Sequence, residues 1–309
     1  SLQADMVVLA IGVTPDTALA KEAGLELGIK GSIVVNDRME TSVPDIYAAG
    51  DAVQVKHYVT GDDALISLAG PANKQGRIIA DNICGGDSHY LGSQGSSVIK
   101  VFDMTAATTG INETNAKKSG LEVDTVILSP MSHAGYYPGG KVMTMKVVFE
   151  KETYRLLGAQ IIGYEGVDKR IDVLATAIHA GLKATQLKDL DLAYAPPYSS
   201  AKDPVNMAGF MIDNIAKGTL KQWHLEDMDK ISKDKNVVLL DVRTVGEFNR
   251  GHMKGFNNIP VDELRERISE IEKGKPVYLI CQSGLRSYIA SRILEGNGYE
   301  TYNFSGGFR

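Results

Sequence analysis

The chain has 309 residues, of which 43% are hydrophobic and 23% charged, and its formal net charge at pH 7 is −5. This composition is ordinary for a globular chain of two or three domains. Its apolar runs all fall far short of the roughly 20 residues that a helix needs to cross a bilayer, and its lysines and arginines form no basic cluster. We therefore expect neither a membrane nor a nucleic acid as partner.

The two cysteines, Cys84 and Cys281, lie far apart in unlike contexts, which argues against a disulfide framework. We expect a reducing, cytoplasmic compartment. Cys84 stands at a predicted helix end before two glycines, so we interpret it as structural. The six histidines have no metal-ligand spacing, and we predict no metal site.

The first part of the chain alternates predicted strands with helices. Residues 4–12 have the pattern of a buried strand that stops at a glycine, a helical segment follows to about Gly24, and residues 31–36 form another predicted strand. The stretch TSVPDIYAAGDA, residues 41–52, predicts a strand and a turn. Its small residues allow a cofactor to approach the backbone, and Asp51 can hold a polyol. Residues 68–82 predict a helix.

This part resembles the flavin-dependent pyridine nucleotide-disulfide oxidoreductases, whose T-x-x-P-x-I-Y-A-x-G-D motif matches residues 41–51. The resemblance implies that Asp51 binds the ribityl chain of FAD and that the N-terminus of the following helix faces the flavin. It places Asn73 near a thiol substrate. The family's G-x-G-x-x-G fingerprints for FAD and NAD(P)H, and a redox cysteine upstream, are not found here. We therefore expect a chain that lacks its N-terminal half. The candidate FAD residues are Thr41, Ala49, Gly50, Asp51 and Pro71.

Residues 98–215 predict an α+β unit that resembles the dimerisation domain of the same family. The resemblance implies a homodimer formed through residues 97–217, preceded by the FAD/NAD(P) region at 1–96 and followed by another domain at 218–309. The expected strands span 98–102, 123–128, 142–150 and 156–162, and the expected helices 112–119, 167–180 and 203–215.

The motif YAPPYSS, residues 194–200, has tyrosine where glutathione reductase and its closest relatives have a His-Pro pair. This departure resembles coenzyme A-disulfide reductases and their rhodanese-fused relatives. It implies that Tyr194 lies beside the flavin as a catalytic and cofactor-binding residue, with Tyr136 or Tyr137 as its companion. Tyr198 and Lys202 are then expected to contact coenzyme A, the lysine through a phosphate. The alternatives are ordinary packing for the tyrosine pair and a solvated surface lysine.

The last part centres on CQSGLRS, residues 281–287. An apolar strand at 276–280 precedes it and a helical pattern at 287–294 follows, so Cys281 stands at a strand-to-helix turn. Gly284 relieves the backbone, Arg286 adds positive charge and the helix start points its N–H groups inward. These features favour a thiolate or a persulfide. The alternative is a small buried core residue.

The whole segment resembles the rhodanese sulfurtransferases. Their succession of D-x-R, E-F, G-H-x-x-G-x-x-N-I-P and C-x-x-G-x-R-S is matched from Asp241 to Ser287. Four residues separate Cys281 from Arg286, whereas cysteine phosphatases have five, so the loop suits a sulfur atom better than a phosphate dianion. We predict Cys281 as persulfide carrier, with Arg286 and the loop as its anion clamp. The loop residues are Gln282, Ser283, Gly284, Leu285 and Ser287.

Together these parts predict a multidomain enzyme of α/β and α+β classes, with a parallel sheet in its rhodanese part. The predicted activity is NAD(P)H- and FAD-dependent reduction of coenzyme A disulfide, persulfides or polysulfides, with sulfane sulfur carried on Cys281. Two alternatives stay open: a sulfur-carrier module on a dimerising scaffold without reductase activity, and an NADH oxidase of the same fold.

Overall fold

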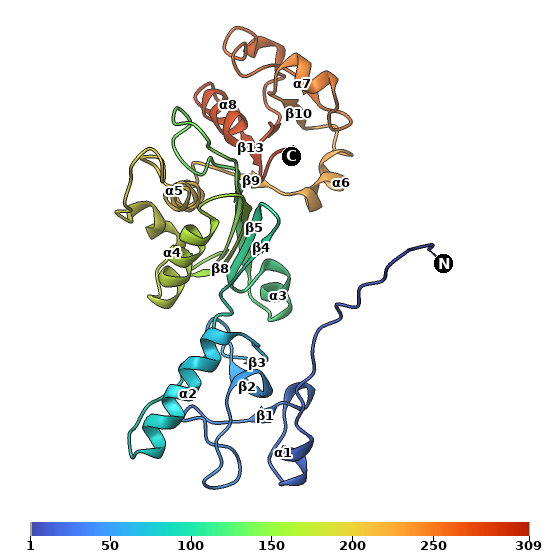
Figure 1. Ribbon diagram of the computed structural model, residues 1–309. Helices are drawn as coiled ribbons and strands as arrows, with labels where there is room; N and C mark the ends of the chain where they lie inside the picture. The colour runs from blue at the N-terminus through green and yellow to red at the C-terminus, as the bar shows by residue number, and fades with distance from the viewer. Residues whose placement is uncertain (1, 309) are drawn as a thin grey trace. The chain divides into compact units, whose positions relative to one another are not determined.

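The computed structural model describes residues 2–308, which divide into two compact units, one ending at Ser97 and the other beginning at Val98 (Figure 1). Within the described residues, no helix has both the length and the apolar character needed to span a membrane.

The first unit is built on a small sheet with strand order β1-β2-β3, in which β2 pairs parallel with β1 and antiparallel with β3. Met39, Val53 and Val55 form its buried core. Its elements are α1 (Ala18–Glu22), η1 (Ile29–Gly31), β1 (Ile33–Val34), η2 (Gly50–Ala52), β2 (Val53–Lys56), β3 (Asp63–Ala64) and α2 (Ala69–Ile83).

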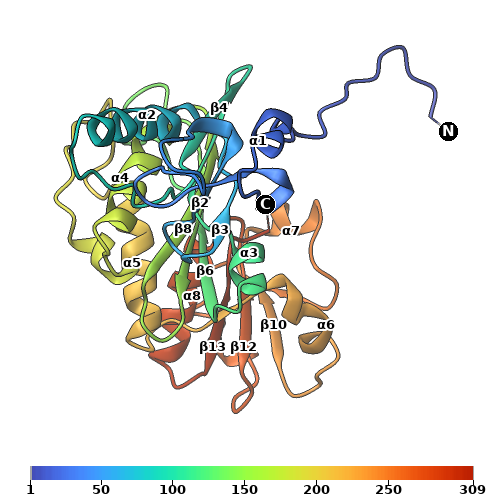
Figure 2. The ribbon, with the colours of Figure 1, turned by 90° about the horizontal axis from the view of Figure 1, so that it is seen from below.

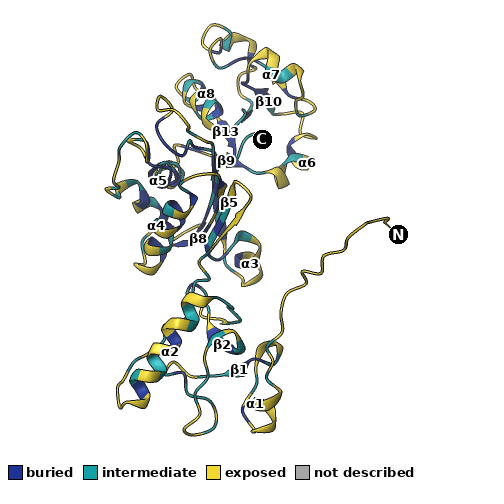
Figure 3. Cartoon of the chain, in the orientation of Figure 1, coloured by how far each residue is buried: buried dark blue, intermediate teal, exposed yellow. Residues whose placement is uncertain are grey.

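Two strand predictions in this unit are wrong. Residues 4–12 are irregular and exposed, with Ile11 at 91% exposure, as the yellow N-terminal segment of Figure 3 shows. A strand needs a neighbour to pair its N–H and C=O groups, and no described strand pairs with this segment. Residues 41–52 form no strand: their regular structure is limited to an isolated β-bridge between Glu40 and Tyr47 and a 3₁₀ turn at Gly50–Ala52. Pro44, followed by Asp45 at φ +63°, interrupts the extended backbone there.

The second unit begins with a five-stranded sheet in the order β4-β5-β8-β7-β6. Helices α4 and α5 lie on one face and α3 on the other (Figures 1 and 2). The predicted strand at 123–128 is confirmed as β6, whereas β5 was not predicted. The elements are β4 (Ser97–Val101), β5 (Met104–Gly110), α3 (Glu113–Lys118), β6 (Val123–Leu128), β7 (Thr144–Glu150), β8 (Leu156–Gly163), α4 (Val167–His179), η3 (Ala184–Asp189) and α5 (Pro204–Ala216).

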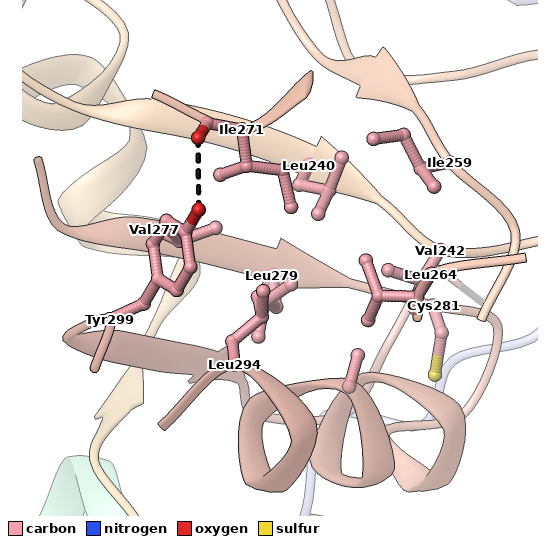
Figure 4. Packing of buried hydrophobic residues seen from close by; sticks show 11 residues of the cluster. Leu240, Val242, Ile259, Leu264, Ile271, Val277, Leu279, Cys281, Leu294 and Tyr299 are labelled. Carbon is pink, nitrogen blue, oxygen red and sulfur yellow. Dashed lines mark hydrogen bonds between the residues drawn. The ribbon is translucent and has the colours of Figure 1, made fainter. Parts of the chain in front are cut away.

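The last part of the second unit is a parallel five-stranded sheet in the order β11-β10-β12-β13-β9, which confirms the predicted parallel sheet. Leucines and valines of β10 and β12 pack against α8 (Figure 4). The elements are β9 (Gln222–Trp223), η4 (Leu225–Asp227), α6 (Met228–Ile231), β10 (Val238–Asp241), α7 (Val245–Asn249), β11 (Asn257–Asn258), η5 (Ile268–Glu270), β12 (Val277–Ile280), α8 (Leu285–Glu295) and β13 (Thr301–Phe304).

The junction between the two sheets is structured. Trp223 is 1% exposed, packs against Phe304 and donates its indole N–H to the Leu279 carbonyl at 3.1 Å. It therefore belongs to the core of the parallel sheet, whereas its place in the junction between two predicted domains favours an interface residue. The next residue, His224, contacts Asp124 of β6 at 3.1 Å, so a side-chain hydrogen bond connects the two sheets.

Candidate functional site

The sulfur of Cys281 lies at the carboxyl end of β12, beside the first turn of α8 (Figure 4). The residue is fully buried. Sγ accepts hydrogen bonds from the Gly284 N–H at 3.1 Å and from the Ser287 hydroxyl at 3.2 Å. Gly284 has φ +91°, a conformation that only glycine adopts without strain. The turn therefore presents two donors to the sulfur, as an anion requires.

Arg286 is held by a carboxylate beside the loop. Its two terminal nitrogens donate to the two oxygens of Glu247, both at 2.7 Å. This bidentate pair, helped by Thr244, holds the pKa of Glu247 far below its usual range. The guanidinium is thus paired with Glu247, and Sγ accepts its hydrogen bonds from Gly284 and Ser287. The anion-clamp role of Arg286 stays a prediction.

The D-x-R motif forms the buried frame behind the loop. Asp241 and Arg243 are both almost fully buried and pair at 2.6 Å. Arg243 also donates to the Gly251 carbonyl at 2.9 Å, and Asn258 donates to the carbonyls of Asp241 and Arg243. A buried charge requires partners of this kind, so these motif residues, which are far from the cysteine in sequence but beside its loop in space, hold the surrounding segments in place.

A second cluster lies on the antiparallel part of the second unit. The hydroxyls of Tyr136 and Tyr194 are 2.7 Å apart, and this hydrogen bond raises the pKa of Tyr194. Tyr137 instead packs edge-on against His133, with ring centroids 5.6 Å apart. Tyr136 is therefore the tyrosine that accompanies Tyr194. Tyr194 and Tyr198 line a cavity of about 710 Å³.

Lys202 lies apart from that cavity. Its ammonium is 5.2 Å from the centre of the Phe210 ring, and it lines a second cavity of about 510 Å³. That cavity is also lined by Ser283 and Leu285 of the cysteine loop. The two residues predicted to contact coenzyme A, Tyr198 and Lys202, are thus not brought together in one cavity.

In the first unit, the turn with Asp51 meets the start of α2. The Gly50 N–H donates to the buried side chain of Gln75 at 2.7 Å, and Gly50 has φ +83°. Asp51 is exposed, and no side chain caps the first turn of α2, where Pro71 lies. An exposed carboxylate beside free helix N–H groups fits a cofactor with a polyol chain and an electron-rich ring edge.

The other predicted residues of this unit have local partners. The Thr41 hydroxyl donates to the Ile46 carbonyl at 2.9 Å and shapes the turn, while Ala49 is exposed immediately before Gly50. The Asn73 amide donates to the Ala69 carbonyl at 2.9 Å within α2, on an exposed face.

Sequence reasoning missed two residues that position these sites. Gln75 fixes the Asp51 turn, and nothing in the sequence distinguishes it from a surface glutamine. Arg170 is 1% exposed on α4 and could have been found, because it falls at helical spacing on the apolar face of Val167, Ile171 and Leu174. A charge on a buried face indicates a specific partner.

Fold and site together define a multidomain oxidoreductase part joined to a sulfurtransferase-like part. Residues 1–76 match the pyridine nucleotide-disulphide oxidoreductases, residues 96–204 match the dimerisation domain of that family, and residues 224–309 match the rhodanese-like domain. The chain belongs to the pyridine nucleotide-disulphide oxidoreductases that carry a rhodanese-like domain.

Individual relatives agree with this assignment. A CoA-dependent NAD(P)H sulfur oxidoreductase of Pyrococcus abyssi is 40% identical over 203 residues, which are 66% of this chain and 45% of that protein. Reduced Bacillus anthracis CoADR-RHD superposes with a TM-score of 0.95 at 49% identity, covering 99% of this chain and 55% of that one. A NAD-dependent persulfide reductase of A. fulgidus superposes with a TM-score of 0.88 at 43% identity, covering 98% of this chain and 56% of that one. The chain thus spans about half the length of these relatives.

Proposed function

We propose that this chain is part of an NAD(P)H- and FAD-dependent reductase of coenzyme A disulfide, persulfide or polysulfide, in which Cys281 carries the sulfane sulfur. One observation carries the proposal: a fully buried cysteine sulfur with two converging donors, in the same chain as a disulfide-oxidoreductase dimerisation domain. The names of the relatives support the substrate class.

The geometry at Cys281 supports a sulfur-transfer step. The thiolate attacks the terminal sulfur of a polysulfide, an S–S bond breaks, and the shortened polysulfide leaves with the electron pair. The outer sulfur of the new persulfide is then attacked by the thiolate of coenzyme A, which restores Cys281. The donors from Gly284 and Ser287 stabilise the thiolate at the start and end of this cycle.

Reduction of the product needs two electrons. One coenzyme A persulfide, one NAD(P)H and one proton give coenzyme A thiol, hydrogen sulfide and NAD(P)⁺. FAD, when bound, supplies the relay between nicotinamide and sulfur. In this chain, Asp51 and the first turn of α2 would hold it, with Thr41, Ala49, Gly50 and Pro71 around them.

The tyrosine pair is assigned to the leaving thiolate. A phenol has an ordinary pKa near 10, so at neutral pH it acts as a hydrogen-bond donor or acid. The hydrogen bond between Tyr136 and Tyr194 fixes the orientation of each hydroxyl relative to the other. Tyr198, in the same cavity as Tyr194, is assigned to coenzyme A there, and Lys202 to a phosphate near the cysteine loop.

A homodimer through residues 97–217 completes the proposal. Edge strand β4 and the turn after it leave apolar side chains exposed, with Phe102 at 93% and Ile99 at 60%. Monomeric proteins rarely expose an apolar row of this kind on a sheet edge.

The test traps the sulfur directly. The complete natural polypeptide is incubated with polysulfide, alkylated, and digested for mass spectrometry. The proposal predicts one added sulfur on the peptide with Cys281 and none on the peptide with Cys84, which is exposed and outside the site. An unmodified Cys281 peptide would contradict it.

A further inference from the structure

The two paired tyrosines lie on different loops, and their own side chains do not fix their positions. Tyr136 is 77% exposed and Tyr194 is 44% exposed, so packing around the rings contributes little. Their hydroxyls are nevertheless 2.7 Å apart. Because neither ring is buried, the backbone of the two loops has a large part in setting this distance.

Arg170 of α4 connects the backbones of these two loops through hydrogen bonds. One terminal nitrogen, Nη2, donates to the Ser132 carbonyl at 3.0 Å, in the loop that leads to Tyr136. The same nitrogen lies within hydrogen-bond distance of the Tyr198 carbonyl, at 3.3 Å, and of the Ser199 hydroxyl, at 3.0 Å, in the loop that follows Tyr194, so its two hydrogens are shared among these acceptors. A direct bond from the Ala134 N–H to the Ser199 carbonyl, at 2.9 Å, joins the same two loops.

The charge of Arg170 is balanced inside the protein. Asp203, which is 3% exposed, accepts from Nη2 of Arg170 at 2.9 Å and from the Ser199 hydroxyl at 2.6 Å. Asp203 also caps α5 by accepting from the Val205 N–H at 3.0 Å. The guanidinium is thus fixed by a buried carboxylate and two loops. A rigid fork of donors suits this arrangement, and a lysine ammonium cannot reproduce it.

We propose that Arg170 is a positioning residue that sets the Tyr136–Tyr194 pair for the reductase reaction. The inference rests on the proposed function, because it assigns the pair to the leaving thiolate. Arg170 touches no reacting atom and acts through the two loop backbones. A small displacement of the loops changes the relation between the hydroxyls without removing either tyrosine.

The chain offers a matched pair of substitutions. Gly166 and Gly181 stand at the two ends of α4, and both have φ +68°. A Cβ at position 166 would lie 2.1 Å from Nη1 of Arg170, whereas a Cβ at position 181 meets nothing within 4 Å. Gly166→Ala therefore displaces the guanidinium, while Gly181→Ala carries the same backbone strain without the displacement.

The experiment uses the complete natural polypeptide with FAD and measures steady-state NADH oxidation with coenzyme A disulfide. We expect Gly166→Ala and Arg170→Lys to lower kcat about tenfold, in line with the large losses that displaced catalytic groups cause, with the KM for NADH unchanged. Gly181→Ala is expected to keep the wild-type kcat. In a Tyr194→Phe background the same two changes should have little further effect.

Three outcomes would overturn the inference. One is an equal kcat for Gly166→Ala and Gly181→Ala, and another is a full additional loss in the Tyr194→Phe background. The third is an unchanged kcat for Tyr194→Phe alone, which removes the proposed role of the pair itself and is distinguishable from a failure of Arg170. If Gly166→Ala fails to fold, Ser199→Ala removes one acceptor of the guanidinium without a backbone change and decides the question by the same readouts.

Discussion

Ser287→Ala tests the cradle around Cys281. The Ser287 hydroxyl has one hydrogen, which lies between Sγ at 3.2 Å and the Gly284 carbonyl at 3.1 Å. A hydrogen bond to a charged group contributes about 1.5–3 kcal/mol, and because the hydrogen is shared we take the lower end, about 1.5 kcal/mol. At roughly 1.36 kcal/mol per tenfold change in rate, the alkylation of Cys281 at a fixed pH should slow about tenfold.

The assay is the rate of iodoacetamide alkylation at a fixed pH, followed on the Cys281 peptide by mass spectrometry so that Cys84 does not interfere. Ser291→Ala is the matched control, because Ser291 is equally buried on α8 but donates to the Tyr288 carbonyl at 2.7 Å. An unchanged alkylation rate for Ser287→Ala, or an equal loss of rate for Ser291→Ala, would refute the reasoning.

Three further predictions concern the frame of the parallel sheet. Gly307→Ala should abolish sulfur transfer, because its Cβ would lie 2.6 Å from the Gln282 carbonyl, whereas Gly298→Ala, also at positive φ but in open space, should retain it. Trp223→Ala should lower the free energy of unfolding by about 3–5 kcal/mol in urea titration, and a loss below about 1 kcal/mol would contradict the packing described. The hydrogen bond to Asp124 raises the pKa of His224 in the folded protein. The stability that this pair contributes is therefore fully present below pH about 6.5, the pKa of an unfolded histidine, and is lost as the pH rises through the higher pKa of the folded protein. Denaturation at several pH values should show this decline, and Asp124→Asn should remove it.

The rhodanese part was predictable because its signals are local. A short apolar strand, a glycine at positive φ and an amphipathic helix define the turn that holds Cys281, and the structure has β12, Gly284 and α8 in that order. The start of α8 at Leu285 lies two residues before the predicted start, since the helix begins directly at the glycine.

The features that could not be predicted from the sequence depend on partners that are distant along the chain. The apolar pattern of residues 4–12 predicts a strand, but a strand exists only where another one pairs with it. The choice of Tyr136 over Tyr137 depends on a loop that Arg170 fixes from α4. Likewise, Lys202 and Tyr198 are four residues apart in sequence, yet they line different cavities, because the ammonium of Lys202 lies over the ring of Phe210 of α5.

The partner of Arg286 shows the same limit. The E-F motif was part of the resemblance, but its chemical reason is visible only in three dimensions, where Glu247 takes both terminal nitrogens of Arg286. An arginine near a cysteine in sequence therefore does not by itself show that its charge acts on the thiol, because the arginine can be paired with a carboxylate.

The most direct test of the account is anaerobic NADH oxidation by the complete natural polypeptide with polysulfide as substrate, with and without coenzyme A, comparing wild type with Cys281→Ser. The account predicts turnover that requires coenzyme A and falls in the variant. Equal rates of NADH oxidation in wild type and variant would contradict it, and would show that Cys281 lies off the reductase path.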